Sequence, residues 1–493
     1  MSRQGREVQR RAQEKICNGR WVEALNKQVP QSHYLPIQVI LSPVNYIDGQ
    51  QMKQIDTLIH AGWVIPVEPA NVVLEDHSLA IDDGRIVAIL PGDEARQQYR
   101  GKNELTLAGQ ALIPGLINTH THAAMSLFRG LADDMPLMEW LNDHIWPAEG
   151  KWANGNFVHD GTRLAIAEMV RGGTTCFSDM YFFPDEVAHV VSQSGMRAAV
   201  GLIMIDFPTA WASGPDEYLS KGLKVHDDYR HDPLISTTFA PHAPYTVSDE
   251  PLRRLQMYAE ELDVPLHIHL HETAHEVNDA LQQSGRRPIE RLEALGLLTP
   301  HLIAVHMTQL TDGEIESVAT AGAHVVHCPE SNLKLASGFC QIHKLHQAGV
   351  NVALGTDGAA SNNDLDMFGE MRTAALLAKA VGEDASAIPA ATALQMATLN
   401  GARALGLERE IGSLTVGKAA DIVAIDLSEL ESQPLYNPIS QIVYATNRDK
   451  VSHVWVNGRH LLKERALTTL DENHILEKTR QWRQKIAESD QQQ

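Results

Sequence analysis

Two histidines, His120 and His122, follow an apolar run in the segment 114–122, which reads Pro-Gly-Leu-Ile-Asn-Thr-His-Thr-His. Successive side chains of a β-strand point to opposite faces, so these two imidazoles should lie on the same face, one pleat apart. Two imidazoles at a strand end can bind one metal ion. In a chain with 24 histidines the pair could also be coincidental, so the remaining ligands decide the matter.

Further residues of the same kind end later apolar runs. Residues 265–271 contain three alternating histidines and precede Glu272, and two more apolar runs end at His306 and Asp357. Each of these residues lies where a strand would stop and a loop would begin. In a (β/α)8 barrel all such ends meet at one mouth, where the chemistry takes place. Imidazoles and carboxylates without thiolates suit a catalytic Zn²⁺ or Fe²⁺ with an open position.

The charge balance excludes some partners. The 493 residues include 41 basic and 62 acidic ones, a net charge of −21 that repels nucleic acid, so a small-molecule substrate is favoured. No apolar run approaches the roughly 18 residues that a membrane span needs. The four cysteines form no C-x-x-C pair, so we expect neither a thiolate zinc site nor a disulfide framework. This cysteine usage predicts a cytoplasmic location.

Residues 1–51 differ in character from the rest of the chain. They begin with a basic, polar stretch that lacks the apolar core of a signal peptide, and alternating apolar residues start at Ile55. Our hypothesis is that Met52 is the natural start and that 1–51 is an N-terminal extension outside the fold. Peptides from 1–51 in the mass spectrum of the native protein would contradict it.

Short strands predict a small β-sandwich domain built from both chain ends, 52–111 and 412–467. Asp83-Gly84 and Asn457-Gly458 each separate two strand-like runs, and both dipeptides are strong hairpin signals. We expect residues 468–493 to form a C-terminal helix and tail.

Between these segments, residues 112–411 predict an α/β fold, a (β/α)8 TIM barrel. Strand-like apolar runs alternate with helical stretches such as 162–171 and 251–262, as a parallel barrel requires. The expected strands lie at about 112–119, 173–179, 197–204, 235–241, 265–271, 302–307, 324–328 and 350–356.

From Ile55 onward the chain resembles the amidohydrolase superfamily, and within it the methylthioadenosine/S-adenosylhomocysteine deaminase branch. The family pattern is H-x-H after strand 1, H-x-x-E at strand 5, a histidine at strand 6 and an aspartate at strand 8. Here it falls on His120 and His122, His269 with Glu272, His306, and Asp357.

The resemblance implies one divalent metal ion per subunit, bound by His120, His122, His269 and Asp357. Zn²⁺ is the expected ion, with Fe²⁺ or Mn²⁺ as alternatives. A two-metal site needs a bridging carboxylate or carbamylated lysine, and residues 239–245 at the end of strand 4 offer neither acid nor lysine.

Strand 5 is ambiguous from spacing alone, because His267, His269 and His271 share one face. The family spacing to Glu272 selects His269 as the ligand. His267 is then expected to be a core histidine one pleat deeper, and His271 to lie one pleat higher, near solvent.

The implied chemistry is hydrolysis of a cyclic amidine C–N bond, as in an adenosine-type aminohydrolase. Water activated by the metal would attack a carbon such as C6 of adenine. Glu272 would move a proton to the ring nitrogen and then to the departing amine. Asp357 could accept the proton of the water, and His306 could orient the water or stabilise developing charge. A helix-terminal acid is the structural alternative for Glu272.

Family likeness also implies substrate contacts by Trp140, Glu149, His242, Glu272 and Ser361, with Glu149 accepting hydrogen bonds from the ribose hydroxyls. The alternative for the tryptophan and Glu149 is aromatic packing under a lid beside a solvated acid.

Residues 206–222 contain no arginine and only one lysine, Lys221, although a substrate carboxylate is usually captured by arginine. We therefore expect 5′-methylthioadenosine or adenosine, with S-adenosylhomocysteine less favoured. The alternatives are a guanine, 8-oxoguanine or cytosine deaminase, a triazine-type hydrolase, or a non-enzymatic scaffold relative. Family likeness also suggests a homo-oligomer.

Overall fold

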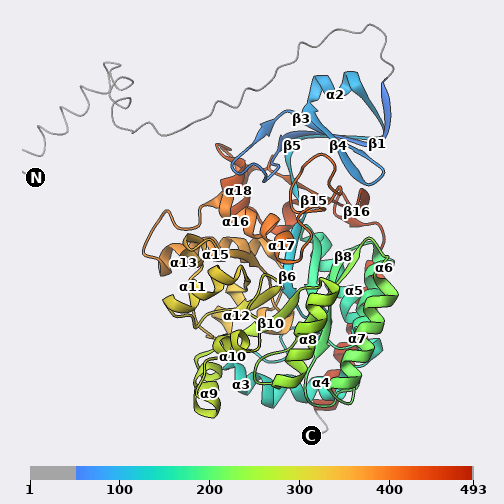
Figure 1. Cartoon of the computed structure of the whole chain (residues 1–493). Helices are drawn as coiled ribbons and strands as arrows, with labels where there is room; N and C mark the ends of the chain where they lie inside the picture. The colour runs from blue at the N-terminus through green and yellow to red at the C-terminus, as the bar shows by residue number, and fades with distance from the viewer. Residues whose placement is uncertain (1–51, 491–493) are drawn as a thin grey trace, which may run out of the picture. The chain divides into compact units, whose positions relative to one another are not determined.

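The computed structural model describes residues 52–490, and the proposed extension 1–51 lies outside them (Figure 1). Eight parallel strands follow one another around a barrel in chain order. They are β6 (Leu116–Thr121), β7 (Thr174–Asp179), β8 (Arg197–Met204), β9 (Ile235–Pro241), β10 (Leu266–Leu270), β11 (Leu302–His306), β12 (His324–His327) and β13 (Asn351–Leu354). The predicted α/β barrel is confirmed.

Helices connect these strands, and α6 and α7 pack on β8 (Figure 1). Helix α5 begins before the predicted 162, because Asn154 caps it by accepting hydrogen bonds from the backbone N–H groups of Asn156 and Phe157. The connecting helices are η1 (Ala123–Phe128), α3 (Leu137–Glu139), η2 (Trp140–Ile145), α4 (Trp146–Trp152), α5 (Gly155–Arg171), α6 (Pro184–Ser194), α7 (Pro215–Tyr229), α8 (Asp249–Leu262), α9 (Ala274–Ser284), α10 (Pro288–Ala294), α11 (Asp312–Ala321), α12 (Pro329–Lys334), α13 (Ile342–Gln347), α14 (Ala359–Asn362), α15 (Met367–Val381), α16 (Ala390–Met396) and α17 (Leu399–Ala404).

Hydrogen bonds beyond the strand ladders join the first barrel strand to the last. The Asn118 side chain donates to Thr356 Oγ1 at 2.8 Å and accepts from the Thr356 backbone N–H at 3.0 Å. The backbone N–H of Asp357 donates to the carbonyl of His120 at 3.0 Å. The closure of the ring therefore brings two predicted metal ligands together.

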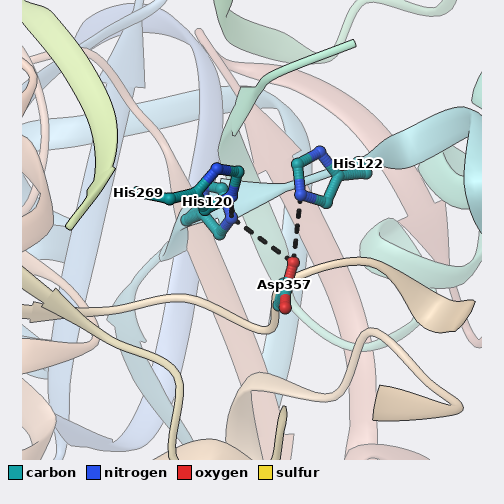
Figure 2. A group of neighbouring side chains, drawn as sticks. All are labelled: His120, His122, His269 and Asp357. Carbon is teal, nitrogen blue, oxygen red and sulfur yellow. Dashed lines mark hydrogen bonds and ion pairs between the residues drawn. The ribbon is translucent and has the colours of Figure 1, made fainter. Parts of the chain in front are cut away.

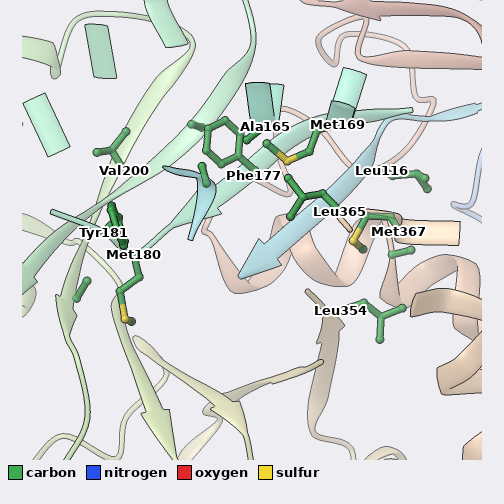
Figure 3. Packing of buried hydrophobic residues seen from close by; sticks show 14 of the residues in the cluster. Leu116, Ala165, Met169, Phe177, Met180, Tyr181, Val200, Leu354, Leu365 and Met367 are labelled. Atoms are coloured by element: carbon green, nitrogen blue, oxygen red, sulfur yellow. The ribbon is translucent and has the colours of Figure 1, made fainter. Parts of the chain in front are cut away.

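Apolar side chains fill the space between the barrel strands and the surrounding helices. In Figure 3, Phe177 of β7 lies near Ala165 and Met169 of α5, and all three are buried. Removal of this apolar surface from water is the main stabilising contribution to the barrel.

The two chain ends form a second, mixed sheet, as predicted. Both predicted hairpins are present, with φ of 49° and 72° at Asp83 and Gly84 and of 48° and 74° at Asn457 and Gly458, the conformation that these dipeptides favour. The strands of this sheet are β1 (Lys53–Val64), β2 (Leu74–Glu75), β3 (His77–Asp82), β4 (Arg85–Pro91), β5 (Tyr99–Pro114), β14 (Ile422–Asp426), β15 (Val451–Val456), β16 (Arg459–Lys463) and β17 (Ala466–Leu467). The helices of the same two segments are α2 (Gly92–Gln98), η3 (Leu430–Ser432), α18 (Pro438–Tyr444) and η4 (Arg448–Lys450).

The run predicted as one strand at 112–119 belongs to both sheets. Its first part ends β5, which pairs with β1 and β14, and its second part is β6. Gly115 lies between them, and a Cβ there would be 1.9 Å from Thr175 Oγ1. The chain can therefore pass from one sheet to the other here because the residue is glycine. The boundaries of the two domains stay a prediction.

The C-terminal helix α19 (Glu472–Asp490) packs on α5. Its buried Trp482 meets Phe157 edge to face and donates from Nε1 to Asp160 Oδ2 at 2.9 Å. Among the helices of residues 52–490, none combines the length and hydropathy needed to cross a bilayer.

Candidate active site

Four side chains from three parts of the barrel point toward one another at the carboxyl ends of its strands (Figure 2). His120 ends β6 and His122 follows it, His269 lies on β10, and Asp357 follows β13. One ligand atom from each of these residues lies within 4.8 Å of those from the other three. The Nε2 atoms of His120 and His269 are 3.1 Å apart, and Asp357 Oδ1 is 3.4 Å from His120 Nε2 and 3.1 Å from His122 Nε2.

This donor set fits one divalent cation. Separations of 3.1–3.4 Å between donor atoms are those expected when each atom is about 2.0–2.2 Å from a shared ion. Three imidazoles and one carboxylate without a thiolate are typical of catalytic centres, in which a further position stays open to water.

The second nitrogens of two imidazoles hold these rings in place. His122 Nδ1 donates to the carbonyl of Met180 at 2.5 Å, and His269 Nδ1 donates to the carbonyl of His242 at 2.8 Å. A proton on Nδ1 leaves the lone pair of Nε2 free for a metal. Backbone geometry therefore sets both rings in the ligating tautomer.

Asp357 is held at a positive φ of 63°. Its Oδ1 accepts from the backbone N–H of Gly358 at 2.8 Å and faces the histidines, while Oδ2 accepts from the hydroxyls of Ser331 at 2.7 Å and Ser361 at 2.9 Å. Burial raises the pKa of Asp357, but the His120 and His122 imidazoles outweigh it and hold that pKa well below its ordinary value. The carboxylate is thus ionised and oriented.

Glu272 and His306 lie beside these ligands. His306 Nε2 is 3.8 Å from Glu272 Oε2, and its Nδ1 donates to Asn332 Oδ1 at 2.8 Å. The ring of His306 stacks on that of His269 with centroids 5.4 Å apart. Burial raises the pKa of Glu272, which suits a group that both takes up and releases a proton.

Glu276 positions the backbone that carries Glu272, a role that the sequence reasoning missed. Its carboxylate accepts from the backbone N–H of Glu272 at 2.7 Å and of His271 at 3.2 Å. Thr308 Oγ1 donates to the carbonyl of Glu272 at 2.7 Å. The spacing Thr273-x-x-Glu276, a helix-capping pattern, was the available signal.

His271 does not lie near solvent, and that prediction was wrong. Its φ of 52° ends the alternation of the strand, and the imidazole is fully buried, with Nε2 accepting from the backbone N–H of Ile289 at 3.2 Å. Ile289 belongs to α10, so the ring contacts this helix instead of the metal ligands. The deeper His267 is buried, as predicted.

A cavity of about 240 Å³ is lined by three of the four ligands, His122, His269 and Asp357. Trp140, Glu149, His242, Glu272 and Ser361, the predicted substrate contacts, all line it. Its walls are largely apolar and include Met125, Leu141, Ile145, Ile203, Ile205 and Phe207.

Several of these polar groups already have protein partners. The indole N–H of Trp140 donates to the carbonyl of Ala132 at 3.2 Å, so this N–H is already paired within the protein. The Ser361 hydroxyl donates to Asp357 Oδ2, and His242 Nδ1 is 3.0 Å from Thr246 Oγ1.

Glu149 is a half-buried residue of α4 that lines the cavity. Burial raises the pKa of its carboxyl to about 7, although the neighbouring Tyr181 and His122 lower it. Tyr181 also lines the cavity, and no sequence pattern singled it out.

Comparison with known proteins agrees with this site. The family model described as "Amidohydrolase family" matches residues 111–461. The chain belongs to the amidohydrolase family. This amidohydrolase is 53% identical over 433 residues to a protein of Teredinibacter turnerae named 5-methylthioadenosine/S-adenosylhomocysteine deaminase, covering 88% of this chain and 98% of that protein.

Among solved structures, an adenosine deaminase from Xanthomonas campestris with bound zinc is 56% identical with a TM-score of 0.88, covering 89% of this amidohydrolase and all of that chain. An atrazine chlorohydrolase from Arthrobacter aurescens is 24% identical with a TM-score of 0.80, covering 86% of this chain and 99% of its own, and shows the fold alone. The protein is a metal-dependent hydrolase that acts on C–N bonds.

Proposed function

We propose that this amidohydrolase deaminates adenine nucleosides, replacing the 6-amino group by a carbonyl oxygen and releasing ammonia. The observation that carries the proposal is the position of Glu272 beside the four metal ligands, at the wall of a cavity large enough for a base. The names of the relatives support the same reaction for those proteins.

A divalent ion bound by the four ligands would supply a water activated for attack at neutral pH. Glu272 would carry one proton of the attacking water to the ring nitrogen next to C6. Asp357 would accept the second proton of the water, and Glu272 would then pass that proton to the departing amine, so that the carbonyl forms as the C–N bond breaks and neutral ammonia leaves. His306, held by Asn332 and beside Glu272, orients the water.

Glu149 and Trp140 would contact parts of the nucleoside away from the reacting carbon C6. A carboxylate accepts two hydrogen bonds readily, and vicinal ribose hydroxyls offer two donors. The buried ring of Trp140 provides a flat apolar surface for the nucleoside. His242 and Ser361 complete the proposed contact set.

The walls favour an apolar 5′ group. Neither lysine nor arginine is among the described residues that line the cavity. Lys221 donates to the Trp211 carbonyl and pairs with Glu217 at 2.7 Å. A substrate with an amino-acid carboxylate would therefore lack a cationic partner, so 5′-methylthioadenosine and adenosine are preferred to S-adenosylhomocysteine.

A substrate panel tests the proposal. Zinc-loaded protein is given 5′-methylthioadenosine, adenosine, S-adenosylhomocysteine, guanine, 8-oxoguanine, cytosine and a chlorotriazine, and ammonia or chloride release is measured. We expect turnover of the first two nucleosides above all others, and its loss with a chelator. Turnover of a free base or of the triazine alone would contradict the proposal and assign that compound as the substrate. Failure of the protein to bind metal would favour a non-enzymatic scaffold protein. A homo-oligomer and a cytoplasmic location stay predictions.

A further inference from the structure

His267 contacts a metal ligand directly. It lies on β10, two residues before His269, and is fully buried. Its Nε2 is 3.0 Å from Nδ1 of His120, with the two rings nearly perpendicular at 84°. Its own Nδ1 is 3.3 Å from Ser178 Oγ on β7. A line of three polar side chains thus crosses the barrel interior, from β6 through β10 to β7.

The contacts along this line determine which ring nitrogens of His120 and His267 carry a proton. His120 turns Nε2 toward the other ligands, so a bound metal requires its proton to be on Nδ1. That Nδ1–H then donates to His267, whose Nε2 must be bare. The proton of His267 is therefore on Nδ1, directed at the oxygen of Ser178.

We propose that His267 is a positioning residue, whose Nε2 holds His120 in the orientation and tautomer that bind the metal. The other two imidazole ligands, His122 and His269, use the backbone carbonyls of Met180 and His242 for this purpose. Of these three described ligands only His120 depends on a side chain. Its affinity for metal can therefore be changed at a position that touches neither metal nor substrate.

The test compares two variants of similar shape in the full-length protein. The amide oxygen of His267→Gln can accept the His120 proton, whereas His267→Met has no such acceptor. Outer partners of metal ligands typically contribute about 10–100-fold to affinity, so His267→Met should weaken zinc binding by about that factor and His267→Gln much less. Zinc dissociation constants come from competition with a chromogenic chelator, and the visible spectrum of the Co²⁺-loaded proteins reports ligand geometry.

Equal zinc affinities of the Gln and Met variants would overturn the proposal, since the ring would then only fill space. The melting temperatures of all variants in chelator serve as the folding control. If His267→Met does not fold, Ser178→Ala decides, because it removes only the acceptor of the His267 proton. Weaker zinc binding by Ser178→Ala, at an unchanged metal-free melting temperature, would support the proposal. Unchanged zinc binding would reject it. The inference rests on the metal site and not on the substrate, so zinc affinity can decide it even if deamination is not found.

Discussion

His122 Nε2 lies 3.1 Å from Asp357 Oδ1, although one residue comes after the first barrel strand and the other after the last. The hydroxyl of Thr121 reinforces this contact by donating to the carbonyl of Asp357 at 2.9 Å. The candidate metal site therefore sits on the closure of the barrel, and its ligands come together only when the ring is complete.

Replacement of Asp357 by asparagine should abolish activity and weaken zinc binding by at least about 100-fold, because it removes a charged ligand and not merely an outer partner. Metal content after dialysis and ammonia release measure the two effects. Asp364→Asn is the matched control and should keep its zinc, because Asp364 pairs with Arg448 at 3.7 Å and is not one of the four clustered residues. Full zinc occupancy in Asp357→Asn would contradict the ligand assignment.

Replacement of Glu272 by glutamine should lower kcat by about 10²–10⁴-fold, the usual contribution of a general acid–base group, while zinc remains bound. Gln keeps the shape of the side chain but cannot exchange a proton. Steady-state kinetics and metal analysis on the same preparation separate the two properties. An unchanged kcat would remove Glu272 from the proposed mechanism.

Binding of nucleosides should improve as the pH rises through about 7, because burial raises the pKa of Glu149 to that value. Below it the carboxyl is protonated and accepts fewer hydrogen bonds, and above it the carboxylate can accept from both ribose hydroxyls. KM for adenosine is measured from pH 5.5 to 8.5. Glu149→Gln, or 2′,3′-dideoxyadenosine as substrate, should remove this dependence, and its persistence in both would exclude Glu149 as the cause.

Replacement of Gly115 by alanine should destabilise the protein by about 1–3 kcal/mol, the usual cost of overpacking, because the new methyl group would overlap Thr175. Urea unfolding measures the loss. Adding Thr175→Ala should recover part of it, whereas Thr174→Ala at the neighbouring position should not. Equal effects of the two second mutations would show that the clash is not specific.

Some of the site could be predicted because its signals are local. The period of a β-strand places His120 and His122 on one face whatever the rest of the chain does. The two Gly-containing turns could likewise be predicted from the sequence, since Asp83-Gly84 and Asn457-Gly458 adopt the positive φ values that such pairs favour.

Other features depend on where distant segments pack, and no spacing reveals them. The positive φ of His271 turns its ring toward α10, although strict alternation places it beside His269. The run 112–119 looks like one strand, yet Pro114 ends one sheet and Leu116 begins the other.

The sequence by itself determined the fold class and the types of residue at the metal site, because strand periodicity and residue chemistry are properties of short segments. Only the tertiary structure decided which atoms meet. It places Asp357 Oδ1 beside Nε2 of His120 and of His122, and it places His267 Nε2 beside Nδ1 of His120. The physical reason is that contacts between strands depend on barrel closure and backbone direction, which are set by the packing of the whole domain.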